Sequence, residues 1–193
     1  MNRPAKNQND FETSQRGATL IEAALFTVIA MGTIVGGIVF FQQASTSAKT
    51  NELIRSIATI QTQVRSLFQA RGDYGKKELN TLLITSNAVP SNLMEDADSD
   101  GTLDTLAHGF GGTINVTGAT REFTVALTLV PVNVCSRIIS FDPLGNGIIG
   151  SGIVSLSDGT TTDTDGISPS EAATFCTTNA TNGTVSLTWR FER

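Results

Sequence analysis

Residues 18–41 read ATLIEAALFTVIAMGTIVGGIVFF, a long and nearly uncharged apolar run. It holds 24 residues and a single charged side chain, Glu22. As an α-helix it would be about 36 Å long, enough to cross a bilayer core of about 30 Å. A membrane anchor is the simplest interpretation. A secretory signal peptide fits poorly, because the run is too long and no small-residue cleavage site ends it.

Glu22 is the unusual residue of the apolar run. An unpaired carboxylate in lipid costs several kcal/mol, so an acidic residue at this depth is a functional candidate. The alternative is a tolerated carboxylate whose side chain reaches the membrane interface. The preceding segment, residues 1–17, is polar, with three basic and two acidic side chains.

The segment that follows, residues 42–71, is amphipathic. Because no proline occurs between Pro4 and Pro90, the two segments predict one continuous helix from about residue 19 to 70. We expect Gly72 and Gly75 to stop it. The apolar half has nothing in its own chain to pack against outside a membrane, so copies of itself are the simplest partner. The amphipathic half carries an apolar stripe with 4-3-4-3 spacing, made by Leu53, Ile57, Ile60, Val64 and Leu67.

Residues 72–193 predict a globular α+β head. Alternating or β-rich runs predict strands at 113–116, 122–130, 152–156 and 184–191. Short helices are expected at 131–139 and at 169–175, the second capped by Ser168 with Glu171 completing a capping box. Residues 142–150 and 158–166 are expected to form loops. The predicted fold is a long N-terminal helix with an antiparallel sheet packed on its C-terminal half.

The composition excludes several classes of function. The formal charge of −5 disfavours a nucleic-acid surface, which needs clustered Lys and Arg. His108 is the single histidine, so a His-rich metal site is excluded and nucleophile–His catalysis is disfavoured. We expect His108 to be structural. The two cysteines cannot build a thiolate zinc site but can form one disulfide. No constellation indicates an enzyme.

Residues 16–22, RGATLIE, resemble the processing site of type IV prepilins. The resemblance implies that prepilin peptidase cuts between Gly17 and Ala18 on the cytoplasmic side of the membrane and then N-methylates Ala18. It also implies that Glu22 pairs with the N-terminal amine of a neighbouring subunit and draws each new subunit into register.

The head is similar to that of the type IVb subgroup, which includes the toxin-coregulated, bundle-forming and conjugative thin-pilus pilins. The similarity lies in residues 89–92, 108–116, 131–135 and 175–176, and in the 17-residue leader. It implies a cleaved leader at 1–17, a transmembrane and polymerisation half-helix at 18–41, an amphipathic half-helix at 42–71 and a head at 72–193.

The same resemblance implies a major structural subunit of an extracellular pilus for adhesion, aggregation or conjugation. Its expected partners are identical subunits, prepilin peptidase, and the assembly platform with its ATPase. The precursor would sit in the bacterial inner membrane with a cytoplasmic N-terminus and a periplasmic head. No nucleic-acid partner is expected.

Cys135 and Cys176 would both lie on the exported side, where disulfides form. They enclose 40 residues, so a bond bounding the region 135–176 would contribute roughly 3–4 kcal/mol of loop entropy. The alternative is two unpaired buried thiols.

One acidic stretch has the D-x-D-x-D-G spacing of a calcium loop. Its usual twelfth-position Glu is replaced by Ala107, and a solvated acidic turn is the alternative interpretation. No other cofactor is expected. The candidate Ca²⁺ ligands are Asp96, Asp98, Asp100, Thr102 and Asp104.

Two rival functions stay open at this point. A minor pilin or a type II secretion pseudopilin would share the same N-terminus. A protein of a different class, a membrane-anchored adhesin or calcium-binding protein that never polymerises, would share the apolar run but would not need Glu22 for assembly.

Overall fold

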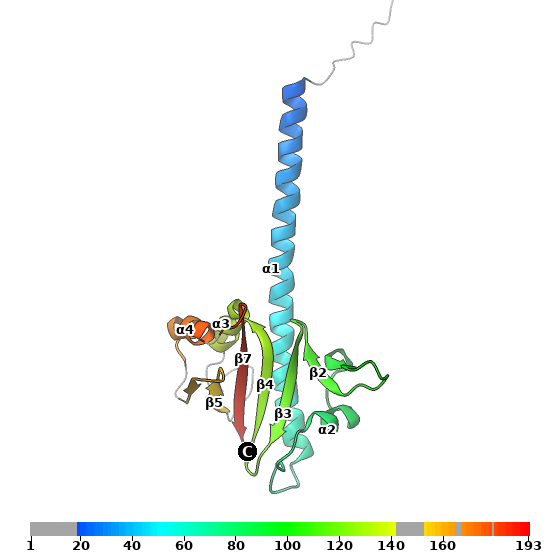
Figure 1. The fold of residues 1–193 in the computed structure, drawn as a ribbon, viewed down its shortest axis with the longest axis vertical. Coiled ribbons are helices and arrows are strands. Elements are labelled where there is room, and N and C mark those ends of the chain that lie inside the picture. Colours follow the sequence, from blue (N-terminus) through cyan, green and yellow to red (C-terminus); the bar gives the residue numbers. More distant parts are fainter. Residues whose placement is uncertain (1–18, 142–152, 165–166, 179) are drawn as a thin grey trace, which may run out of the picture. The chain divides into compact units, whose positions relative to one another are not determined.

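The computed structural model describes residues 19–141, 153–164, 167–178 and 180–193 (Figure 1). Packing divides the chain after Gln43, inside the long helix α1, and the two units are described separately. The expected loop at 142–150 lies outside the described residues. The helices are α1 Leu20–Leu67, α2 Asn80–Thr85, the 3-10 turn η1 Ser91–Leu93, α3 Val132–Phe141 and α4 Pro169–Thr178. The strands are β1 Met94–Glu95, β2 Thr105–His108, β3 Gly112–Gly118, β4 Glu122–Pro131, β5 Ile153–Ser157, β6 Thr162–Asp163 and β7 Thr184–Glu192.

The second unit is built on one antiparallel sheet with the order β1-β2-β3-β4-β7-β5-β6. The last strand of the chain, β7, lies between β4 and β5 in the middle of the sheet (Figure 1). The C-terminal strand is therefore paired on both sides, with Val125 opposite Trp189 on one side and Leu156 opposite Trp189 on the other. The prediction of a long helix with an antiparallel sheet is confirmed.

The core is formed by one face of α1 and one face of the sheet. Along β7, and along β4 as far as Leu127, every second side chain is buried, as period-2 alternation requires of a sheet covered on one face. On the helix Ile57, Ile60 and Val64 are fully buried, and each such side chain contributes about 1.5–3 kcal/mol. The apolar stripe predicted for the amphipathic half-helix is this buried face, except that Leu67 is exposed.

The helix α1 ends at Leu67, three residues before the predicted end and well before Gly72. The glycines are therefore not what stops it. Phe68 and Tyr74 are both buried, and their rings lie 5.5 Å apart between centroids, with Tyr74 in turn 5.1 Å from Phe123. Because both rings pack into the core, the chain must leave the helix and turn between them.

Short elements between residues 77 and 108 were not predicted. The segment 77–80 serves as a partner for the outer edge of β3, where β2 is too short to reach. Leu79 N–H donates to the Val116 carbonyl at 2.8 Å, and Asn80, buried, donates to the Ile114 carbonyl and accepts from Val116 N–H, both at 2.9 Å. A side chain thus completes the ladder, which no period-2 pattern can signal.

The predicted helices and strands of the C-terminal half are confirmed with small shifts. Pro131 ends β4, opposite Thr184, where the first turn of a helix was expected, and α3 begins one residue later. The expected loop at 158–166 contains the short strand β6. The capping box of α4 is present: Ser168 N–H donates to Glu171 Oε2 at 3.0 Å and Glu171 N–H to Ser168 Oγ at 3.4 Å.

Candidate functional site

The first turn of α1 positions Glu22. Thr19 precedes the helix, its carbonyl accepting from Ala23 N–H at 3.1 Å and its hydroxyl from Glu22 N–H at 3.3 Å. Glu22 is exposed and lies in the first turn, where the helix dipole favours a negative charge. Gly17 and Ala18, the predicted processing residues, lie outside the described residues.

The apolar part of α1 is exposed along its length. Thirteen large hydrophobic side chains between Leu20 and Phe41 are 51–91% exposed, and this helix is apolar enough to cross a membrane. A Cβ placed on Gly32, Gly36 or Gly37 would meet no heavy atom within 4 Å. The helix runs through all three glycines, so they leave open surface on which another helix could approach closely.

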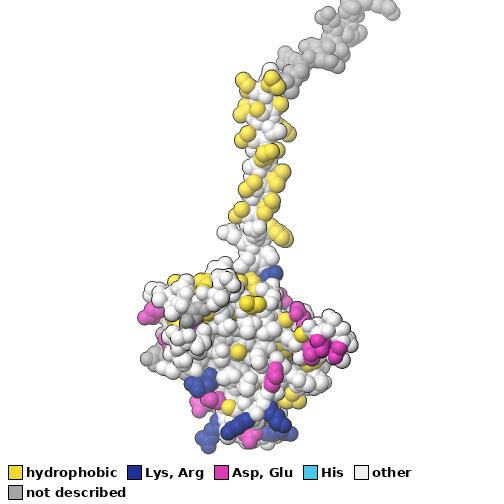
Figure 2. All heavy atoms as spheres, viewed as in Figure 1, with side chains coloured by type: hydrophobic (Ala, Val, Ile, Leu, Met, Phe, Trp, Pro, Cys, Tyr) yellow, Lys and Arg dark blue, Asp and Glu magenta, His cyan; other side chains and the backbone are white. Residues whose placement is uncertain are grey.

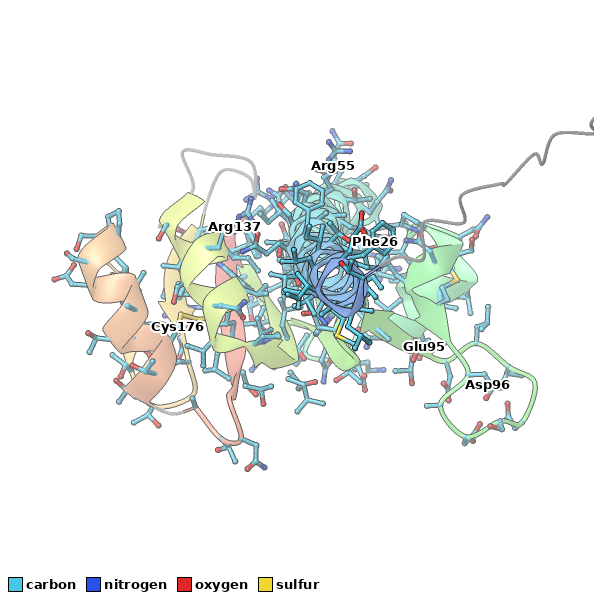
Figure 3. All side chains as sticks on the ribbon, turned by 90° about the horizontal axis from the view of Figure 1, so that it is seen from above. Phe26, Arg55, Glu95, Asp96, Arg137 and Cys176 are labelled. Carbon is cyan, nitrogen blue, oxygen red and sulfur yellow. A yellow bond between two sulfur atoms is a disulfide. The ribbon has the colours of Figure 1, made fainter. Side chains whose placement is uncertain are left out.

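The disulfide joins α3, which follows the central strand β4, to α4, which precedes the central strand β7. Cys135 in α3 and Cys176 in α4 are bonded, with their Cα atoms 6.0 Å apart and both side chains fully buried (Figure 3). The bond therefore ties α4 to α3, which directly continues the central strand β4. This confirms the predicted pairing.

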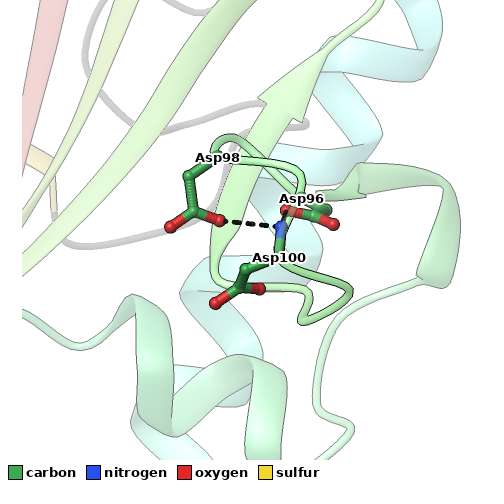
Figure 4. Close-up of side chains that lie close together, drawn as sticks. All are labelled: Asp96, Asp98 and Asp100. Atoms are coloured by element: carbon green, nitrogen blue, oxygen red, sulfur yellow. Dashed lines mark hydrogen bonds between the residues drawn. The ribbon is translucent and has the colours of Figure 1, made fainter.

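The acidic residues of the predicted calcium loop partly converge. Ligand atoms of Asp96, Asp98 and Asp100 all lie within 4.8 Å of one another (Figure 4). Their oxygens accept from groups of the loop itself, including Gly101 N–H to Asp96 at 2.8 Å and Asp100 N–H to Asp98 at 3.3 Å. The Gly101 N–H lowers the pKa of Asp96, and the Thr102 hydroxyl lowers the pKa of Asp100.

The remaining parts of the calcium pattern do not complete a cage. Asp104 accepts from Ala97 N–H at 3.5 Å, and Thr102 donates its hydroxyl to Asp100. Ala107, at the twelfth position, is buried in β2 and offers no carboxylate. The loop is thus held by its own hydrogen bonds, as the solvated-turn interpretation expects, and calcium binding stays a prediction.

His108 has a structural role in the sheet. It is buried, its Nε2 lies 2.8 Å from the Thr128 carbonyl, and its Nδ1 accepts from Phe110 N–H at 3.4 Å. Nε2 therefore carries the proton in the neutral ring. Loss of solvation on burial lowers the pKa of His108, against an opposing effect of the hydrogen bond to Thr128. The Thr128 carbonyl belongs to a β-bulge, next to Leu129 at φ +53°.

The lowered pKa of His108 predicts that acid destabilises the head between pH 7 and 5. In this window the unfolded chain binds a proton that the folded chain resists, so the free energy of unfolding falls as the pH falls. Urea midpoints measured at pH 7, 6 and 5 should decrease for the wild type and stay level for His108→Gln. The carboxylates of Asp96, Asp100 and Glu171 have lowered pKa values, so they take up protons below this pH window. Equal slopes for both proteins would contradict the assignment.

A groove of about 310 Å³ was not predicted from the sequence. One wall is the exposed side of α1 between Ala48 and Thr59, and the other is Pro90 with Asn92. Asn92 donates its side-chain amide to Glu52 Oε1 at 2.6 Å, which holds the two walls together. Because its two walls lie about forty residues apart in the chain, no local sequence pattern predicts the groove.

Known proteins are similar to this chain over most of its length. The family described as PilS N terminal matches residues 47–190. The chain is 26% identical over 183 residues to the major structural subunit of bundle-forming pilus from Escherichia coli O111:H-, covering 87% of this chain and 91% of that protein. The homologous subunit of Escherichia coli O127:H6 is 25% identical with the same coverage. The crystal structure of type IV b pilin from Salmonella typhi matches with a TM-score of 0.56 at 20% identity, over 72% of this chain and 97% of that one.

Proposed function

The chain belongs to the type IVb pilin family, and from that premise we propose that it is the major structural subunit of a type IVb pilus. The relatives of matching length are major subunits of bundle-forming pili, which favours this role over a minor pilin or a pseudopilin. Members of the family are structural subunits and not enzymes. The filament itself would consist of identical copies of this chain.

One observation carries the proposal: the apolar part of α1 is exposed over more than twenty residues and contains one carboxylate. Exposed apolar area of this size is unstable in water, so it must be covered by lipid or by protein. The precursor would hold this segment in the inner membrane, with the N-terminus cytoplasmic and the head periplasmic. After assembly, the same segments of neighbouring subunits would cover one another in an extracellular fibre.

In this proposal, processing converts the membrane-held precursor into a subunit that can enter the fibre. Prepilin peptidase would cut between Gly17 and Ala18 and N-methylate Ala18, and an assembly platform with its ATPase would extract the subunit. The new amine at Ala18 would then meet the Glu22 carboxylate of a neighbour. A buried charge is stable only when its partner is present. A subunit would therefore enter the fibre only in the register that brings its amine to the carboxylate of its neighbour.

Surface fibres test the proposal directly. Cells that express the chain should carry fibres labelled by an antibody against the head in electron microscopy, and the sheared fraction should contain this subunit as its main protein. Cells lacking the chain should carry none. A chain that stays in the membrane fraction of fibre-bearing cells would contradict the proposal and favour the non-polymerising anchor.

A further inference from the structure

The positive charge of the second unit is concentrated at one end. Residues 44–193 contain ten Lys and Arg, and seven of them come from three short segments: the end of α1 with the turn after it, the β3–β4 turn and the end of β7. The same segments carry four acidic residues, so their side chains sum to a positive charge. Figure 2 shows these basic side chains gathered at one end of the head. We define the basic end by its exposed members, Arg71, Lys76, Lys77, Arg121 and Arg193.

Backbone contacts hold the basic end together. Arg193 N–H donates to the Arg121 carbonyl at 3.1 Å, and Gly118 N–H donates to the Lys77 carbonyl at 2.9 Å. The Arg193 guanidinium donates to the Gly72 carbonyl at 3.2 Å. These contacts join the turn after α1 to the β3–β4 turn and to the end of β7, so three separate segments are held together at the basic end.

The negative charge is concentrated elsewhere. The acidic loop, residues 95–104, carries five carboxylates and no basic residue. Its carboxylates accept from backbone and hydroxyl groups of the loop, contacts that orient the charges without neutralising them. The loop stands out from the sheet edge formed by β1 and β2 (Figure 3), and Figure 2 shows acidic side chains gathered apart from the basic end.

We propose that the basic end docks a second copy of this chain through that copy's acidic loop. The proposal rests on the proposed function, which requires copies to assemble. The two surfaces lie apart on one head, so they can meet only between copies. A contact between two different surfaces of identical subunits is head-to-tail, and it generates a filament when the rotation from one subunit to the next does not close a ring. Attraction between them would set register and association rate, and would weaken as salt shortens the screening length.

Charge reversal in the full chain, expressed in cells, tests the proposal. One variant reverses the loop, Glu95→Lys/Asp98→Lys, and a second reverses the basic end, Lys76→Glu/Lys77→Glu. These side chains are exposed, and each variant should keep the disulfide and the melting midpoint of the wild type. Each variant alone should lower the yield of sheared fibres at least about fivefold, because like charges then face each other. The variant carrying all four changes should recover a yield within about twofold of wild type.

A matched control reverses two cations outside the basic end, Arg55→Glu/Arg137→Glu, and should keep most of the fibre yield. The proposal is overturned if the four-change variant is as poor as either reversal, if either reversal alone matches wild type, or if the control loses as much as the basic-end variant. If only the loop variant lost fibre yield, the proposal would also be overturned, and the result would point to a divalent cation bound at the loop. The proposed function is tested separately. It requires that the wild type forms fibres and that Glu22→Ala does not, whatever the charge-reversal variants do.

Discussion

Replacement of Glu22 by alanine is expected to abolish surface filaments. If Glu22 pairs with the Ala18 amine of a neighbour, the substitution leaves that amine unpaired in an apolar environment. Breaking a buried ion pair by removing one partner costs about 3–5 kcal/mol, which corresponds to a loss of roughly two to four orders of magnitude in subunit association. The head should be unaffected, because Glu22 lies in the first of the two units.

The measurement is the amount of subunit in sheared fibres relative to the amount in the membrane. Glu52→Ala removes the other carboxylate of α1 and serves as the control, with a yield close to wild type. Glu22→Asp keeps the charge on a shorter side chain and should retain part of the yield. Wild-type fibre yield from Glu22→Ala would show that the carboxylate does not act in assembly, as in a membrane anchor that never polymerises.

Removal of the disulfide is expected to produce the largest loss of head stability. The bond between Cys135 and Cys176 closes a 40-residue segment, and the loop-entropy relation assigns it roughly 3–4 kcal/mol. In a domain of this size such a loss corresponds to a fall of about 10 °C in the melting midpoint. We expect Cys135→Ala/Cys176→Ala to show this fall in the full-length subunit in detergent.

Reduction supplies the matched control for the disulfide. Treating the wild type with a reductant should reproduce the midpoint of the double variant, and the variant itself should not respond to the reductant. Because the bond ties α4 to α3 at the end of β4, its loss should also free α4 for proteolysis. An unchanged midpoint in the double variant would mean that α3 and α4 pack without help from the bond.

The sequence predicts the elements whose signals are local. Residues 18–41 and the stripe from Leu53 onward predict the helix, and the alternation in residues 122–130 and 184–191 predicts the central strands. The capping box at Ser168 is equally local, since both partners lie within one turn. The processing roles of Gly17 and Ala18 and the assembly role of Glu22 stay predictions that rest on the family resemblance, since no periodicity contains them.

The features that escaped prediction depend on partners far apart in the chain. Asn80 completes the edge of β3 through a hydrogen bond to a residue thirty-four positions away. The helix α1 ends where Phe68 and Tyr74 pack into the core, before Gly72 and Gly75. The basic end combines segments more than one hundred residues apart, as the hydrogen bond from Arg193 to Gly72 shows. Tertiary packing decides these features, and single-sequence patterns do not record it.

The mass of the intact subunit from sheared, unreduced fibres shows whether the chain is processed and assembled as proposed. We expect one main species that begins at Ala18, with one added methyl group on the N-terminal amine and two hydrogens fewer for the disulfide. Fragmentation of the N-terminal peptide should place the methyl group on Ala18. Fibres built of a subunit that retains residues 1–17, or that begins at any other position, would contradict the account.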